Sequence, residues 1–142
     1  SPFGNTGPIP PNANQETTYT AHILVSAQNA VTNAKVTFNL PSYVQWQNVF
    51  TPNANISYDQ KTRTVTWLIG NIAEDASAVS DIGLVVKPSQ SHVGLMPAIT
   101  SGIIFETEEE VSKAKIRMTL SPLTTYISGE SWEENPSRVV DR

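Results

Sequence analysis

Apolar and polar residues alternate along several stretches of the chain with the two-residue period of a β-strand. Residues 17–28 show the pattern most fully, with one face made of Tyr19, Ala21, Ile23, Val25 and Ala27. The other face is mostly Thr, His and Ser, and Leu24 is the exception. Residues 35–40, 64–69, 81–87 and 111–120 alternate in the same way and are rich in β-branched residues. This combination is typical of strands with one buried face.

Proline, glycine and asparagine separate these stretches. Residues 29–33 are predicted to form a turn, Pro41 and Pro52 break the chain, and Gly70 with Asn71 is expected to end a strand. Further strands are expected at 43–50, around Ile56, and at 95–106. The pattern predicts an all-β fold, an immunoglobulin-like antiparallel β-sandwich of two sheets with about seven to nine strands. Trp67 is expected between the sheets.

One stretch has two interpretations. Residues 107–117 (TEEEVSKAKIR) place Glu and Lys at helical spacing and could form a short helix. The alternation continues past this stretch to Leu120, with Ala114, Ile116, Met118 and Leu120 on one face, so a hairpin is favoured.

Residues 58–67 (YDQKTRTVTW) bring Asp59, Lys61 and Arg63 close together in sequence and raise the question of a chemical site. An Asp at the first position of a turn accepts hydrogen bonds from backbone amides two residues on. The stretch is therefore predicted to be a hairpin whose turn Asp59 caps.

The chain has 142 residues, the size of one domain. Residues 1–15, which contain four prolines (positions 2, 8, 10 and 11), are expected to be an extended linker or leading segment, and residues 16–120 the sandwich module. Residues 121–142 are expected to dock on the module or to lead to a next repeat. They contain a possible strand at 124–128 and the pair Val139–Val140.

Composition narrows the classes of function. The net charge is −4 and the basic residues are scattered, which argues against nucleic-acid binding. The absence of cysteine excludes disulfides and thiolate chemistry. No apolar run is long enough for direct membrane insertion, and the first residues do not read as a signal peptide. The chain is thus expected to be either cytosolic or an interior piece of a longer secreted protein.

The residues that could carry chemistry do not form a recognisable set. Acidic residues gather at Glu74, Asp75 and Asp81 and again between Glu106 and Glu110, without the spacing of a calcium loop. His22 and His92 have no partner at metal-binding spacing. Because no nucleophile, metal or phosphate-binding motif is present, we predict that the chain is not an enzyme and has no cofactor or metal site.

Three aromatic residues are the best candidates for contact with a partner. Tyr43, Trp46 and Phe50 follow a strand-breaking proline and could form a platform for a sugar or a protein. The alternative is that they fill one end of the core.

Four motifs in chain order resemble the DUF11-type repeat domain of bacterial and archaeal surface proteins. They are GPIPPNANQETTYT at 7–20, NLPSYVQW at 39–46, YDQKTRTVTWLIGNI at 58–72, and LTTYISGE with VVD between 123 and 141. The resemblance implies an immunoglobulin-like module of an extracellular stalk, with no catalytic residues to carry over. It rests on framework positions: Pro41, Asp59, Thr62, Trp67 and Gly70. Residues 71–78 (NIAEDASA) depart from its usual loop.

The leading hypothesis is a non-enzymatic spacer of a repetitive cell-surface protein, extracellular and in contact with neighbouring repeat modules. One alternative is an adhesin-type module that binds a glycan, calcium or a protein. Another is a fibre subunit that assembles by strand exchange. An intramolecular Lys–Asn cross-link stays open at the level of sequence.

Overall fold

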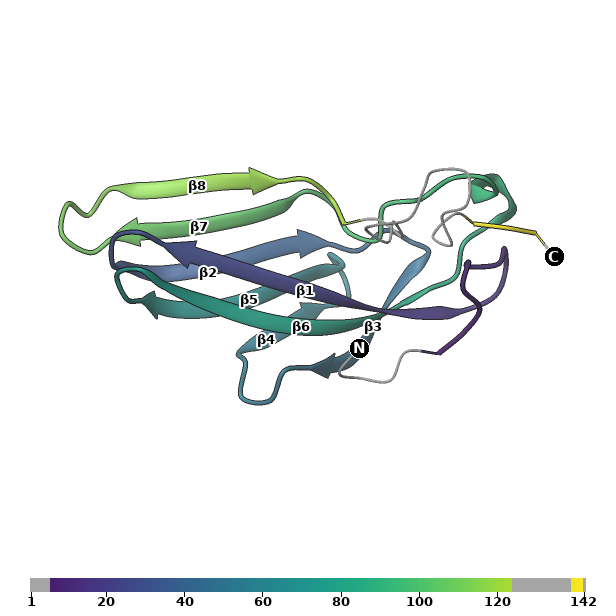
Figure 1. The fold of residues 1–142 in the computed structure, drawn as a ribbon, viewed down its shortest axis with the longest axis horizontal. Coiled ribbons are helices and arrows are strands. Elements are labelled where there is room, and N and C mark those ends of the chain that lie inside the picture. The colour runs from purple at the N-terminus through teal and green to yellow at the C-terminus, as the bar shows by residue number, and fades with distance from the viewer. Residues whose placement is uncertain (1–5, 124–138, 142) are drawn as a thin grey trace.

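The computed structural model describes residues 6–123 and 139–141, and within them the chain forms eight strands and one short 3-10 helix, η1 (Gln90–His92) (Figure 1). The strands lie in two antiparallel sheets, which confirms the predicted all-β sandwich. One sheet has the order β1-β6-β3 and the other β4-β5-β2-β7-β8. The bounds are β1 Thr17–Ala27, β2 Val31–Asn39, β3 Val44–Phe50, β4 Ile56–Asp59, β5 Thr64–Ile72, β6 Ala76–Val86, β7 Ile103–Glu109 and β8 Lys115–Leu120.

The core follows directly from the alternation of the strands. On β1, Ala21, Ile23 and Val25 are buried while His22 and Leu24 are exposed, as the pattern predicts. Trp67 on β5 is 5% exposed, which confirms its place between the sheets. The largest side chains with almost no exposure come from both sheets: Val36, Phe38, Val44, Val65, Ile82, Leu84 and Val86.

Several strand bounds differ from the prediction, mostly because of bulges. β2 begins at Val31, so the predicted turn at 29–33 is too long; Asn33 (φ 54°) lies at a register shift that lets the strand continue. β5 runs through Gly70 (φ 86°) to Ile72 instead of ending at Gly70. Such a bulge adds a residue to one strand without ending the ladder. Because it uses the Asn and Gly residues that are also typical of turns, the sequence at these positions predicts a turn.

Two further bounds were wrong for a different reason. β6 begins at Ala76, not at Asp81, because its first half pairs with the end of β1 through small residues such as Ser77. β7 begins at Ile103, and residues 95–102, predicted as part of a strand, are irregular apart from an isolated bridge position. Apolar content without pairing partners is not enough to make a strand.

Residues 107–117 form a strand, a turn and a strand, so the helical interpretation is wrong. β7 pairs with β8 from Ile103 opposite Leu120 to Glu108 opposite Lys115. The turn is closed by the amides of Glu109 and Lys113, which donate to the carbonyls of Ala114 and Glu109.

The two ends of the described chain lie side by side. Asn12 and Val140 form a parallel bridge, in which the Val140 amide donates to the Pro11 carbonyl and the Ala13 amide donates to the Val140 carbonyl, both at 2.8 Å. Val139 is 1% exposed and lies between this pair and the loop at Gly94 and Leu95. The predicted strand at 124–128 lies outside the described residues.

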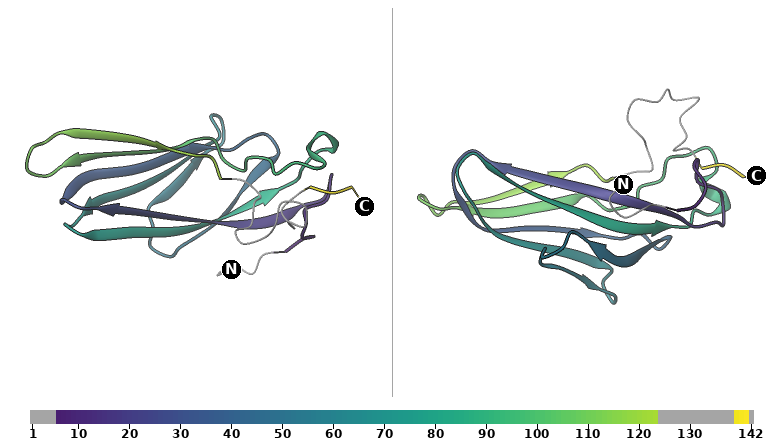
Figure 2. Two further views of the ribbon diagram at one scale, coloured as in Figure 1. Left: turned by 45° about the horizontal axis from the view of Figure 1, so that its top comes forward. Right: turned by 60° about the horizontal axis from the view of Figure 1, so that its bottom comes forward.

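The two sheets have different numbers of strands, so the two sides of the sandwich are closed to different extents. β3 and β4 are the edge strands on one side, and β1 and β8 are the edges on the other (Figures 1 and 2). Because one sheet has three strands and the other five, β7 and β8 extend past β1. No helix among residues 6–123 and 139–141 is long and apolar enough to span a bilayer.

Candidate functional site

Two of the three predicted platform residues, Trp46 and Phe50, pack together, and Tyr58 joins them. The Trp46 ring lies 6.0 Å from Phe50 and 5.6 Å from Tyr58 between centroids, nearly parallel to each. Four residues of regular strand would separate Trp46 and Phe50 by about 13 Å. A register shift between them, with Asn48 at a φ of 57°, shortens that distance.

This stack closes the β3/β4 side of the sandwich. Trp46, Phe50 and Tyr58 are each half-buried and pack against the core cluster. Sequence reasoning missed Tyr58, although its position two residues after the buried Ile56 places it on the same face. The stack therefore has a structural use, and part of each ring is still exposed.

Tyr43 has a different environment from the other two. Its ring packs edge-on against His92 at 4.5 Å between centroids, and its hydroxyl donates to the carbonyl of Ala98. Burial raises the pKa of Tyr43. This side chain fixes the irregular segment that follows η1 rather than extending an aromatic platform.

Tyr19 is half-buried, and its hydroxyl has no hydrogen-bond partner in the described part of the chain. Its hydroxyl is inaccessible to solvent, and burial raises its pKa to about 12. A buried hydroxyl without a partner is unfavourable by about 1–3 kcal/mol.

The 58–67 hairpin has the predicted cap and an additional clamp. The Asp59 Oδ1 accepts hydrogen bonds from the amides of Lys61 (2.9 Å) and Thr62 (3.4 Å), which confirms the capped turn. Arg63, at a φ of 58°, turns its guanidinium toward the end of β2 and the start of β3. There its Nε donates to the Leu40 carbonyl (2.9 Å) and its Nη2 to the carbonyls of Pro41 (2.7 Å) and Val44.

The histidines pair with local groups. The His22 Nδ1 lies 2.6 Å from the Asp81 Oδ1, directly across the β1–β6 pair. The His92 Nδ1 accepts a hydrogen bond from the Ser89 amide at 3.0 Å. Each histidine thus has a contact that sequence spacing does not reveal.

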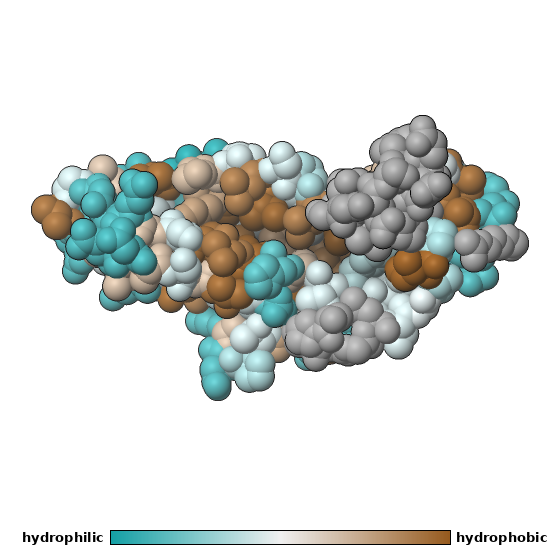
Figure 3. Space-filling model, in the orientation of Figure 1, coloured by the Kyte–Doolittle hydropathy of each residue, from teal (hydrophilic) through white to brown (hydrophobic). Residues whose placement is uncertain are grey.

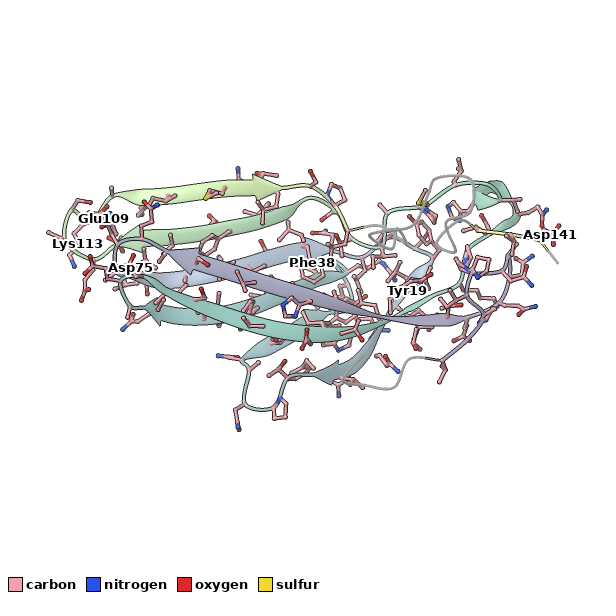
Figure 4. The ribbon with its side chains drawn as sticks, viewed as in Figure 1. Tyr19, Phe38, Asp75, Glu109, Lys113 and Asp141 are labelled. Carbon is pink, nitrogen blue, oxygen red and sulfur yellow. The ribbon has the colours of Figure 1, made fainter. Side chains whose placement is uncertain are left out.

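One acidic residue before β6 and one at the end of β7 lie at the same end of the molecule. Asp75 and Glu109 lie there with Lys113, at the opposite end from Asp141 (Figure 4). Among residues 6–123 and 139–141, no group of three or more His, Asp or Glu side chains is arranged to hold a metal ion. None of the lysines, all of which lie in the described residues, is buried. Lys35 is the least exposed, and its Nζ lies 3.8 Å from the Oε1 of Glu106.

A hollow of about 280 Å³ lies on the β1/β8 side of the sandwich. Ser26 and Ala27 on β1 form one wall, and Phe105, Ile116 and Met118 on β7 and β8 form the other. Figure 3 shows apolar surface in the middle of this face. Unlike the β3/β4 side, this side has no aromatic stack across it within the described residues.

No protein-family model matches the chain, and no curated protein matches it in sequence. Solved structures do match its fold. The major pilin subunit of Bacillus cereus aligns with a TM-score of 0.57 and 9% identity, over 82% of this chain and 36% of the pilin. The three N-terminal domains of a type V pilus tip protein from Porphyromonas gingivalis align with a TM-score of 0.51 and 12% identity, over 69% of this chain and 22% of that structure. At these identities the similarity shows a shared fold, and the chain spans about a third or less of either protein.

Proposed function

We propose that the chain is a non-enzymatic structural module of a cell-surface fibre or stalk, held between neighbouring modules of a longer extracellular protein. The two solved structures described above are both pilus components, and their shared sandwich fold supports this assignment. The resemblance to DUF11-type repeats at 7–20, 39–46 and 58–72 supports the further proposal that such modules are repeated in tandem.

The observation that carries the proposal is the parallel pairing of the two chain ends. The chain enters through residues 11–13 and leaves through Val139 and Val140, and the two segments are joined by two backbone hydrogen bonds. Tension pulls the first segment from its N-terminal side and the second from its C-terminal side. Because the two segments run parallel, these forces act along them in opposite directions, and the hydrogen bonds between them must break together. We call residues 11–13 with Val139 and Val140 the end clamp.

The end clamp has support from its surroundings. Pro11, Asn12, Ala13 and Val139 are all buried, so water does not compete for its hydrogen bonds. The Val139 amide donates to the Leu95 carbonyl and the Gly94 amide donates to the Val139 carbonyl, at 2.9 and 2.8 Å. Tension would thus be carried where the chain enters and leaves, without loading the sheets.

The position of the ends changes how such a module acts as a spacer. The described ends lie at the same end of the long axis (Figure 1), so the sandwich length does not add to the distance between neighbouring modules. We infer that the sandwich projects from the chain path and carries the acidic end, with Asp75 and Glu109, outward.

The polar residues that could have formed a site are used in the framework. Asp59 caps the β4–β5 turn and Arg63 binds three carbonyls. Neither group is free to act on a substrate while it holds these hydrogen bonds, which supports the proposal that the module acts without catalysis.

Immunogold electron microscopy of the source cells tests the proposed location. Antibodies raised against the 142-residue chain should label intact cells, on filaments or on an extended surface layer. Labelling that occurs only after the cells are permeabilised would contradict the proposal.

A further inference from the structure

The turn between β7 and β8 projects beyond the other turns at its end of the molecule (Figures 1 and 2). Val111 lies in this turn, between the end of β7 at Glu109 and the start of β8 at Lys115. Its side chain is 89% exposed, the highest value among the large apolar side chains of the described residues. Turns are usually built from polar residues and glycine, because they contact water. The hairpin instead presents an apolar knob to solvent.

A hollow of matching character lies beside the same hairpin, on the open face of β8. It is the hollow of about 280 Å³ described above, and the buried side chains of Val31 and Phe105 form its floor. Ile116 and Met118 form its rim on β8, and they are 40% and 50% exposed. A water molecule takes up about 30 Å³, so the hollow has room for a valine side chain. Filling it with Val111 would remove apolar surface of both from water.

The hollow of a chain is filled by the Val111 of another copy more readily than by its own. The exposure of Val111 shows that it does not pack in the hollow of its own chain. Phe105, at the floor, lies six residues before Val111, which is about 20 Å along an extended strand. Val111 is at the outer end of the hairpin and the hollow is at its flank.

The knob and the hollow are close enough for two copies to bind each other in the same way. Two hairpins that lie antiparallel and overlap near their ends bring each Val111 over the hollow of the other copy. Both copies then use the same surface, so the contact is twofold and closes at two copies.

The charges at the contact are complementary. Glu109 lies at the rim of the hollow, and Lys113 lies two residues beyond Val111. The Lys113 of one copy therefore approaches the Glu109 of the other, and symmetry repeats this pair. Charge pairs at the rim of an interface orient the partners, while the apolar contact supplies most of the affinity.

We propose that this chain forms a twofold dimer in which the Val111 side chain of each copy occupies the hollow between β1 and β8 of the other. The pairing joins separate chains, so it goes beyond the proposed stalk module and does not depend on it. In a stalk, it connects the outward ends of modules on two neighbouring chains.

Sedimentation equilibrium of the 142-residue chain at increasing concentration tests the pairing. The chain should show a monomer–dimer equilibrium at about 0.15 M salt, where a Debye length of about 8 Å screens the repulsion between the two acidic ends. Val111→Ser should raise the dissociation constant by about tenfold or more, because the change acts at both contacts. In the matched control, Leu24→Ser removes an apolar side chain of 54% exposure from β1 and should leave the dissociation constant unchanged.

Three results of this experiment would overturn the proposal. They are a chain that stays monomeric at about 1 mM, open polymers in place of a dimer, and equal effects of Val111→Ser and Leu24→Ser.

The absence of cysteine permits a second test by disulfide formation. A disulfide needs Cα atoms within about 7 Å of each other, and Met118 pairs with Phe105, about 20 Å from Val111. A Val111→Cys, Met118→Cys double variant can therefore form a 111–118 disulfide only between two chains. Peptide mass mapping should find this linkage, formed at least about tenfold faster than the corresponding linkage in a Val111→Cys, Thr119→Cys control, in which the second cysteine lies on the outward face of β8.

Thermal melting of the reduced variants verifies that both fold. No 111–118 linkage, or equal rates in the two variants, would contradict the proposed dimer.

Discussion

Replacing Arg63 by alanine tests whether the 58–67 hairpin is a structural element rather than a site. The Arg63 guanidinium binds the carbonyls of Leu40, Pro41 and Val44 and so joins the β4–β5 turn to the connection between the two sheets. Leu40 and Val44 are buried, and alanine would leave their carbonyls without this donor.

The expected loss can be worked out from these contacts. A hydrogen bond from a charged donor contributes about 1.5–3 kcal/mol. Arg63 is half-buried and water can reach part of the space that alanine leaves, so roughly one to two of these bonds should be lost in full. We therefore expect Arg63→Ala to lower the free energy of unfolding by about 3 kcal/mol, and the melting temperature by about 10 °C for a chain of this size.

Two companion variants separate the hydrogen bonds from charge and from the turn. Arg63→Lys keeps the charge but lacks the planar set of donors, so it should recover less than half of the loss. Lys61→Ala changes an exposed residue of the same turn and should alter stability by less than about 0.5 kcal/mol. Urea unfolding followed by tryptophan fluorescence measures all three. A loss below about 0.5 kcal/mol in Arg63→Ala would refute the clamp.

Three further outcomes are expected. Trp46→Ala should lower the free energy of unfolding by about 3 kcal/mol because it opens the stack on Phe50 and Tyr58, whereas Trp46→Phe should retain most of the stability. A Trp46→Ala variant as stable as the natural chain would favour a binding role for the exposed rings. Tyr19 should ionise near pH 12 in an absorbance titration at about 295 nm, and ionisation near pH 10 would contradict the burial of its hydroxyl. Since its folded pKa lies above the unfolded value of 10.0, its contribution to stability is present below pH 10 and is lost as the pH rises toward 12. Tyr19→Phe should be as stable as the natural chain or more so. Adding calcium or EDTA should leave the melting temperature unchanged, and a rise of several degrees with calcium would indicate a site at the acidic end.

The periodicity of the sequence predicts the faces of the strands better than their ends. The inward set on β1 and the burial of Trp67 follow from alternation alone. The bounds of β2 and β5 do not, because the bulges at Asn33 and Gly70 use the residues that also make turns. The same holds for Asn48, whose bulge brings Trp46 against Phe50.

Contacts between distant residues are the part that the sequence could not predict. Spacing does not show that Arg63 reaches the end of β2, or that Tyr43 lies with His92 instead of Trp46. The open β8 face is hidden for another reason. Ile116 and Met118 alternate as if they were covered, and only the different widths of the two sheets show that they are not.

The most direct test of the account is the force needed to unfold the chain when it is pulled from its two ends. Val140→Pro removes the amide that donates to Pro11 in the end clamp, and Asp59→Ala removes the cap of the β4–β5 turn, outside the proposed load path. Each change should lower the free energy of unfolding by about 1 kcal/mol. In single-molecule force spectroscopy, Val140→Pro should lower the unfolding force markedly while Asp59→Ala leaves it unchanged. Equal effects of the two variants, or an unfolding force unaffected by Val140→Pro, would contradict the proposal that the end clamp bears the load.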